Sequence, residues 1–286
     1  MNISLSKIKR SSVAILLVPL IVSMNVSCAS RAKNLPAVLG VPTRGTESEQ
    51  AEIEVGRQIY DAILASQYIY TKPEILNYIN EVGWKLAHQS DRPHLPYTFT
   101  ILVDERLYST AAPGGYIFLT TGLLHFVRSE SELAGILAHE IGEVQYQPPV
   151  FSKFKKHAED IAALTAMVGS FFGPIGAASA AGVILLTNVP YGEMDKTELL
   201  YESDKKAVGF MEKSGYDASA LADVLNRARA THEDPNVTAS SVDWENKRPI
   251  TIERMEKLEF ILANRAPSPS PLPEDSKRFT QLMQNI

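Results

Sequence analysis

The segment from Leu137 to Val144 (LAHEIGEV) places three chemically reactive side chains on a short helix-forming stretch. It matches the start of H-E-x-x-H, a pattern in which two histidines at i and i+4 share one helical face and bind Zn²⁺. The glutamate of that pattern acts on the metal-bound water. Here the fifth position is Glu143 instead of histidine. The stretch therefore predicts a zinc-type helix in which one expected ligand has changed.

Two interpretations of His139, Glu140 and Glu143 stay open. In the first, His139 and Glu143 form a charge-assisted pair, which raises the pKa of the histidine and stabilises the helix without metal. In the second, both residues bind zinc, Glu140 is the general base, and a third group completes the ligand set. None of the remaining histidines is favoured as that third group; they are His88, His94, His125, His157 and His232.

The N-terminus has the layout of a secretory signal. Three basic residues precede an apolar run over 13–24, which is too short to span a bilayer. Small residues flank Cys28, the only cysteine, in an arrangement that resembles a bacterial lipoprotein site; cleavage after Ala29 is the alternative. We therefore expect a signal peptide over residues 1–27 and a lipid-anchored tether over 28–46.

Charge and cysteine content limit the possible partners. Loss of the signal lowers the number of basic residues from 28 to 25 against 33 acidic ones, so the net charge changes from −5 to −8. This balance argues against nucleic acid and anionic lipid headgroups as partners. A lone cysteine consumed by lipid leaves no disulfide, so the mature chain depends on packing for its stability.

Periodicity and turn signals predict one domain over residues 47–264, followed by a proline-rich linker and C-terminal segment over 265–286. The domain is expected to be α+β and predominantly α, with a small antiparallel sheet. The predicted elements are helices beginning near Glu49 and at Pro73, strands over 97–103 and 116–121 separated by the turn Pro113-Gly114-Gly115, and helices over 130–146, 198–214, 218–230 and 250–264.

Residues 161–192 carry no charged side chain. Gly173-Pro174 divides this run into halves, each shorter than the roughly 20 residues that a membrane-spanning helix needs. Two small-residue helices packed inside the fold are one interpretation. Contact with a membrane is the other.

Several blocks of the chain resemble zinc metallopeptidase family 48, which includes the HtpX-type and CAAX prenyl endopeptidases. The resemblance runs from about Glu49 to Leu262 and is most similar to an exported bacterial branch without transmembrane helices. The blocks that carry it are YINEVG (78–83), SDRP (90–93), PGGYIF (113–118), GLL (122–124) and SESELAGILAHE (129–140). It implies a zincin-like domain with zinc as the cofactor.

The resemblance also implies a ligand set that this chain keeps only in part. The family's third zinc ligand is a glutamate four residues before an aspartate; here Asp204 remains, and Leu200 stands at the ligand position. Both lie on the inward stripe of one predicted helix, and the family implies that Asp204 supports the site from behind the ligands. Two further family pairs are replaced by Arg248-Pro249 and Tyr146-Gln147.

A separate segment is the candidate for polypeptide binding. In zincin-type enzymes an edge strand beside the metal binds an extended peptide by strand addition. The strand over 116–121 is placed by sequence order to do this, so Gly115, Tyr116 and Ile117 are the predicted peptide-binding residues. An ordinary paired strand is the alternative.

Two functional hypotheses follow. The first is an envelope protein that faces the periplasm, is lipid-anchored to the outer membrane, and binds misfolded or assembling envelope proteins with little or no proteolytic activity. Zinc would be bound weakly if at all, because two ligands hold the metal poorly. The second is an active zinc metalloendopeptidase with an altered ligand set, in which Glu140 is the base and His139 and Glu143 bind the metal.

Overall fold

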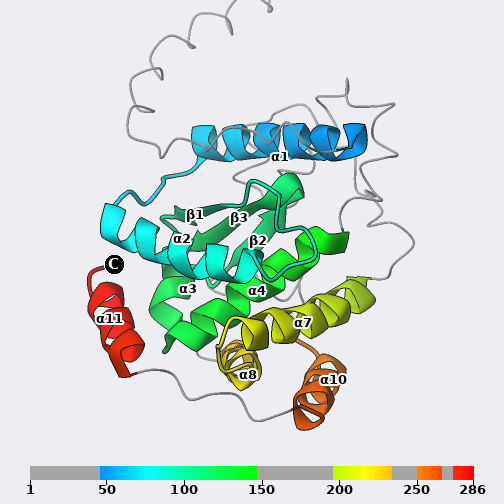
Figure 1. Ribbon diagram of the computed structural model, residues 1–286. Coiled ribbons are helices and arrows are strands. Elements are labelled where there is room, and N and C mark those ends of the chain that lie inside the picture. The colour runs from blue at the N-terminus through cyan, green and yellow to red at the C-terminus, as the bar shows by residue number, and fades with distance from the viewer. Residues whose placement is uncertain (1–45, 147–195, 234–249, 266–272) are drawn as a thin grey trace, which may run out of the picture. The chain divides into compact units, whose positions relative to one another are not determined.

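A computed structural model of the chain describes residues 46–146, 196–233, 250–265 and 273–286. All of them belong to one compact unit, which extends from Val38 to Ile286. Helices predominate, and a three-stranded sheet lies among them (Figure 1). The predicted fold class, α+β and predominantly α, is confirmed.

Two helices precede the sheet, and the residues at their starts explain where they begin. α1 (Glu47–Ser66) begins after Thr46, whose hydroxyl oxygen accepts a hydrogen bond from the Glu49 N–H. This satisfies one of the amides that a first turn leaves without a helical partner. α2 (Pro73–Ala87) begins with a proline, which has no backbone N–H and so leaves no donor without a partner at that position.

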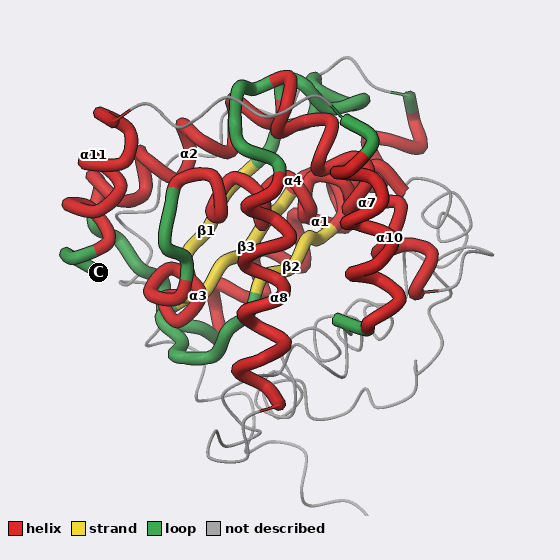
Figure 2. Tube along the Cα trace, turned by 90° about the horizontal axis from the view of Figure 1, so that it is seen from below, coloured by secondary structure: helices red, strands yellow, loops and turns green. Residues whose placement is uncertain are grey.

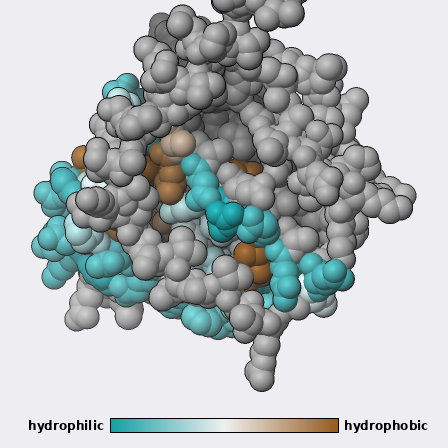
Figure 3. Space-filling model, turned by 90° about the horizontal axis from the view of Figure 1, so that it is seen from above, coloured by the Kyte–Doolittle hydropathy of each residue, from teal (hydrophilic) through white to brown (hydrophobic). Residues whose placement is uncertain are grey.

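α1 covers one face of the sheet (Figure 1). The ring of Tyr60 on α1 lies 5.2 Å from the ring of Tyr116 and 6.0 Å from the ring of Phe118, both on the same face of the central strand. The described surface on the α1 side of the molecule is largely hydrophilic, with small hydrophobic patches (Figure 3). α1 is thus an amphipathic helix with its apolar side on the sheet.

The sheet has the strand order β1-β3-β2 and is mixed. β1 (Thr98–Leu102) runs parallel to β3 (Tyr116–Thr120), and β2 (Ser109–Ala112) runs antiparallel to it. The predicted antiparallel arrangement is therefore wrong for β1 and β3. The reason is β2, in which the chain runs back along the sheet before β3 begins. The sequence of β2 is only STAA, which has a weak strand signal, so this strand was not predicted.

β3 is the central strand, not the expected edge strand. Its backbone pairs with β1 on one side and with β2 on the other. Strand addition to β3 is therefore excluded, because its hydrogen-bonding groups are used inside the sheet. Gly115, Tyr116 and Ile117 are also buried.

The turn between β2 and β3, η1 (Pro113–Gly115), depends on glycine. Gly114 has φ 74° and Gly115 has φ 93°, a region in which L side chains are strained. A Cβ on Gly114 would also lie 2.7 Å from the Cα of Ile53 on α1. The turn and α1 are therefore in backbone contact.

α3 (Thr121–Phe126) and α4 (Glu130–Tyr146) follow the sheet. α4 has the predicted bounds, and every residue from Ser131 to Val144 is buried. It contacts β2 and β3 as well as α2, α7 and α8, and it lies on the near side of the sheet in the view from below (Figure 2). The helix that carries His139 is therefore the central helix of the fold.

The remaining described helices are α7 (Lys196–Lys213), α8 (Ser219–Glu233), α10 (Ile252–Ala263) and α11 (Pro273–Met283). α7 ends at the predicted place, where Gly215 adopts φ 75°. α11 packs against α2 and α4. The C-terminal segment thus contributes to the same compact unit as the other helices.

α10 buries Met255 and Leu258, whereas Ile252 at its start is 66% exposed. Thr251 caps the helix by accepting a hydrogen bond from the Arg254 N–H at 3.1 Å. The side chain of Arg254 lies in the interior, where it is 4% exposed.

None of the described helices is both long enough and apolar enough to cross a membrane. The uncharged run over 161–192 and the lipidation candidate Cys28 lie outside the described residues. What we expect of them therefore stays a prediction.

Candidate functional site

His139, Glu140 and Glu143 lie on the central helix α4, and their exposed fractions are 5%, 0% and 7%. Ionisable side chains at this depth need partners, because the loss of hydration is otherwise uncompensated. The polar contacts of this cluster come from β2, α7 and α10. Segments far apart in the sequence therefore meet at one point.

Asp204 of α7 and Arg254 of α10 form a buried two-point ion pair. Nε and Nη2 of Arg254 donate to the two carboxylate oxygens at 2.7 and 2.9 Å. Burial alone would raise the pKa of Asp204, but the guanidinium outweighs this effect and holds the pKa well below its usual range. Asp204 is therefore ionised at neutral pH.

His139 lies between two carboxylates. Its Nδ1 is 2.7 Å from Oδ1 of Asp204, and its Nε2 is 3.4 Å from Oε1 of Glu143. Both are ion-pair distances. Burial lowers the pKa of His139, but Asp204 and Glu143 outweigh burial and raise the pKa above its ordinary value.

Glu140 points toward the sheet. The hydroxyl of Ser109, on β2, donates a hydrogen bond to Oε1 of Glu140 at 2.6 Å, and both residues are fully buried. A carboxylate held in this way has part of its acceptor capacity occupied by the protein itself. Ser109 was not predicted as a site residue, because β2 was not recognised as a strand.

Arg254 was also missed, although the sequence contains a signal for it. It lies four residues before Leu258, on the apolar face of the predicted last helix. An arginine on such a face needs a buried acceptor, and the inward Asp204 was available to supply one. This pairing could have been proposed from the two helical stripes.

Leu200 lies on the face of α7 that is directed toward α4. It is 2% exposed and four residues from Asp204, so the two side chains lie one above the other. The two helices approach closely at Gly142, where a Cβ would lie 2.7 Å from the carbonyl oxygen of Ser203. The position that carries the third ligand in the resembling family thus faces α4 here, with a side chain that has no donor atom for a metal.

The donor atoms that the structure describes do not make up a catalytic zinc site. Such a site has three protein ligands and leaves one position for water. His139 and Glu143 are two donors on one helix face, and Asp204 is already engaged by Arg254. Across the described ranges, no group of three His, Cys, Asp or Glu side chains could hold a metal ion. Among the described residues, the donor set therefore does not complete the zinc site that the resemblance implies.

The other histidines supply no third donor within the described part of the chain. The ring Nδ1 of His88 is 2.7 Å from the Trp84 carbonyl oxygen, and Nε2 of His94 is 2.8 Å from Glu49. His125 is exposed on α3. His157 and the side chain of His232 lie outside what the structure describes.

The end of α4 has a polar contact of its own. Tyr146 donates a hydrogen bond from its hydroxyl to Oε2 of Glu202 on α7 at 3.2 Å. Burial and the Glu202 carboxylate raise the pKa of Tyr146 above its ordinary value. Gln147 and Arg248-Pro249, the other replaced family positions, lie outside the described residues.

The sequence of this chain is similar to those of a known peptidase family. The model of peptidase family M48 matches residues 74–261, well over half of its length. The chain belongs to peptidase family M48. Zinc is the metal of this family, in agreement with the cofactor that the resemblance implied. The match begins at the start of α2 and so leaves α1 outside it.

Several relatives share this M48 segment. A putative beta-barrel assembly-enhancing protease of Vibrio cholerae is 27% identical over 195 residues, which cover 66% of this chain and 40% of that protein. The beta-barrel assembly-enhancing protease of Escherichia coli K12 is 26% identical over 221 residues, which cover 73% and 44%. That of Yersinia pestis is 25% identical over 202 residues, with 68% and 41% covered. The M48 chain thus spans about two fifths of the length of these relatives.

Proposed function

We propose that this M48 protein acts in the bacterial envelope by binding misfolded or assembling envelope proteins, with little or no proteolytic activity. The observation that carries the proposal is the buried cluster on α4. His139 is flanked by Glu143 and Asp204, and Leu200 stands where the family has its third ligand. A framework of this family with an incomplete ligand set favours binding over cleavage.

The state of Glu140 supports the same proposal. A general base must reach the proton of a water that a metal has activated. With too few metal donors beside it in the described part of the chain, the Glu140 carboxylate has no such water to act on. Its Oε1 instead accepts a hydrogen bond from Ser109. Glu140 then has a structural role, which joins α4 to β2.

The cellular location is part of the proposal. The signal-like N-terminus and Cys28 support export and a lipid anchor in the outer membrane, facing the periplasm. The matched relatives carry names that refer to beta-barrel assembly. We extend that context to this chain as the class of partner that it binds.

The proposed polypeptide-binding surface does not include the residues of β3 and its preceding turn that the sequence predicted. Gly115, Tyr116 and Ile117 are buried beneath α1 or within the sheet. Contact with a polypeptide through them would require an opening of the fold. The proposal therefore rests on the state of the α4 cluster and on family membership, and not on β3.

An active zinc metalloendopeptidase with an altered ligand set is the second candidate function. It is favoured by the names of the relatives, which are proteases, and by the survival of His139 and Glu140. In this case His139 and Glu143 would bind the metal, Asp204 would orient His139 through Nδ1, and Glu140 would be the base.

Metal analysis combined with proteolysis separates the two functions. The mature protein is purified without chelators, and zinc per chain is measured alongside casein cleavage by the native protein and by Glu140→Gln. We expect far less than one zinc per chain and no cleavage that depends on Glu140. One zinc per chain, together with cleavage that Glu140→Gln abolishes, would establish the second function instead.

A further inference from the structure

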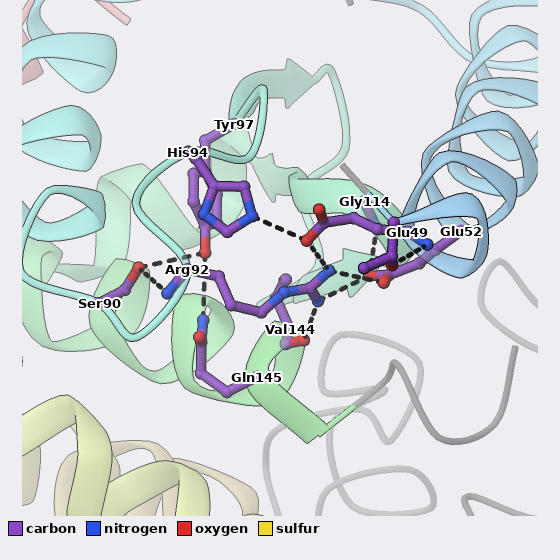
Figure 4. A network of polar contacts seen from close by, with 10 residues as sticks. Glu49, Glu52, Ser90, Arg92, His94, Tyr97, Gly114, Val144 and Gln145 are labelled. Carbon is purple, nitrogen blue, oxygen red and sulfur yellow. Dashed lines mark hydrogen bonds and ion pairs between the residues drawn. The ribbon is translucent and has the colours of Figure 1, made fainter. Parts of the chain in front are cut away.

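A buried ion pair at the far end of α4 joins three elements of the fold (Figure 4). Nη1 and Nη2 of Arg92, in the segment after α2, donate to the two carboxylate oxygens of Glu52 on α1 at 3.0 and 2.7 Å. Nη2 also donates to Glu49 at 2.9 Å. The side chains of Arg92 and Glu52 are 13% and 1% exposed. A two-point pair at this depth has a defined geometry, because the planar fork fits the carboxylate in one orientation.

The same two side chains hold the backbone on either side of them. Oε1 of Glu52 accepts the N–H of Gly114, in the turn η1, at 3.0 Å. Nη1 of Arg92 donates to the carbonyl oxygen of Val144, in the last turn of α4, at 3.3 Å. Val144 directly follows Glu143. The pair therefore connects the helix end that carries Glu143 with the turn that follows β2.

α1 cannot slide over this turn. A Cβ on Gly56 would lie 1.8 Å from the carbonyl oxygen of Pro113, so the backbones of α1 and the turn are interlocked. Gln145 also donates to the hydroxyl of Tyr97 at 3.1 Å and so holds the end of α4 against the residue that precedes β1. These contacts leave the end of α4 and the turn with little independent freedom.

We infer that Arg92 and Glu52 are positioning residues, which clamp the Pro113–Gly115 turn and the last turn of α4 at a fixed separation. α1 then helps to hold the end of α4 that carries Glu143, although it lies outside the family match over 74–261. The Arg92–Glu52 clamp acts on Glu143 through the backbone and touches none of the buried donors directly. The inference does not depend on whether the protein binds zinc or cleaves polypeptides.

Amide hydrogen exchange tests the clamp at the level of individual segments. Two variants weaken it: Glu52→Gln removes the charge, and Arg92→Lys keeps the charge but removes the fork. The control is Glu54→Gln, which breaks an exposed ion pair with Arg57 on the same helix. Exchange is followed at the Gly114 amide, over 143–146, and over 221–228 in α8, which the clamp does not contact.

Both clamp variants are expected to accelerate exchange roughly tenfold or more at Gly114 and over 143–146, since a hydrogen bond to a charged group contributes that much to local stability. Exchange in α8 should stay at the native rate, and Glu54→Gln should change neither segment. Equal acceleration in all three segments would mean that the pair only stabilises the fold as a whole, and the inference would be wrong. Unchanged exchange at Gly114 and over 143–146 would also overturn it, and Arg92→Lys supplies this test if Glu52→Gln does not fold.

Discussion

In the function that we propose, Glu143 and Leu200 are the two side chains that separate the α4 cluster from a zinc site. Glu143 offers an oxygen where the H-E-x-x-H pattern has an imidazole, and Leu200 offers no donor at all. The charges that remain are balanced within the protein, by the contacts of His139 with Asp204 and of Asp204 with Arg254. Removal of one member of such a buried pair typically costs about 3–5 kcal/mol, because it leaves the other charge without a partner.

Restoration of the two missing ligands should restore metal binding. We predict that Glu143→His combined with Leu200→Glu raises zinc affinity by on the order of a thousandfold or more over the native chain, because three ligands then converge on one position. Isothermal titration calorimetry with zinc measures the change directly. The matched control is Glu143→Gln combined with Leu200→Gln, which is polar but supplies no strong zinc ligand. Equal zinc affinity in the restored and native proteins would show that position 200 does not face His139.

The raised pKa of His139 predicts a pH dependence of stability. Because the folded state raises this pKa, the contribution of His139 is fully present below its unfolded value of about 6.5 and is lost as the pH rises through the folded value. The difference in free energy of unfolding between the native protein and His139→Gln should therefore be greatest in mild acid and shrink toward alkaline pH. Urea denaturation with a chelator present measures it. A difference that stays constant with pH would mean that folding does not shift the pKa of His139.

At the scale of secondary-structure elements, α4 determines the arrangement. It is buried along almost its whole length and contacts the sheet as well as α2, α7 and α8. Its contact with α7 is close because Gly142 has no side chain where the backbone of Ser203 passes. This approach brings Asp204 within reach of His139, so helix packing and the site have the same structural origin.

Two glycines on the packed helices α4 and α7 give opposite predictions. Gly142→Ala would place a Cβ 2.7 Å from the Ser203 carbonyl oxygen, so α7 must shift, and we expect a loss of about 1–3 kcal/mol in unfolding free energy. Gly209→Ala, in the interior of α7, meets nothing within 4 Å. It should gain roughly 0.5–1 kcal/mol, because alanine favours the helix. Chemical denaturation measures both; a Gly142→Ala protein as stable as the native one would contradict the close approach of the two helices.

At the scale of the whole molecule, we propose that a tether and a lipid anchor precede the M48 domain. The chain spans about two fifths of the length of its matched relatives, and the proposed anchor and tether lie outside the described residues. A lipid anchor would keep the domain close to the membrane at which outer-membrane proteins assemble. The negative charge of the mature chain would not by itself hold it on an anionic surface.

The anchor itself gives a test at this scale. Cys28→Ser removes the only thiol that a lipid could modify, so the protein should move from the membrane fraction to the soluble periplasmic fraction. Labelling with a radioactive fatty acid, followed by fractionation, measures this. Ala29→Ser, which keeps the cysteine, is the control and should remain labelled. Membrane association of Cys28→Ser at the native level would contradict the lipid anchor and favour a membrane contact elsewhere, such as residues 161–192.

The sequence alone was sufficient for the local features of this protein. The helix start at Pro73, the stop at Gly215 and the bounds of α4 all follow from residues close together in the chain, whereas the first helix begins two residues before the expected Glu49. Capping, periodicity and glycine conformation act over a few residues, so a single sequence displays them directly. The altered ligand position Glu143 was visible for the same reason.

Only the tertiary structure decided which side chains meet. The position of β3 between β1 and β2, the hydrogen bond from Ser109 to Glu140, and the pairing of Asp204 with Arg254 join segments that are from 31 to 50 residues apart or depend on strand order. Such contacts are selected by the packing of whole elements around α4, and the short strand β2 that directs them has almost no local signal. The sequence therefore identifies the ionisable residues of the α4 cluster, whereas the tertiary structure determines which residues from other elements contact them.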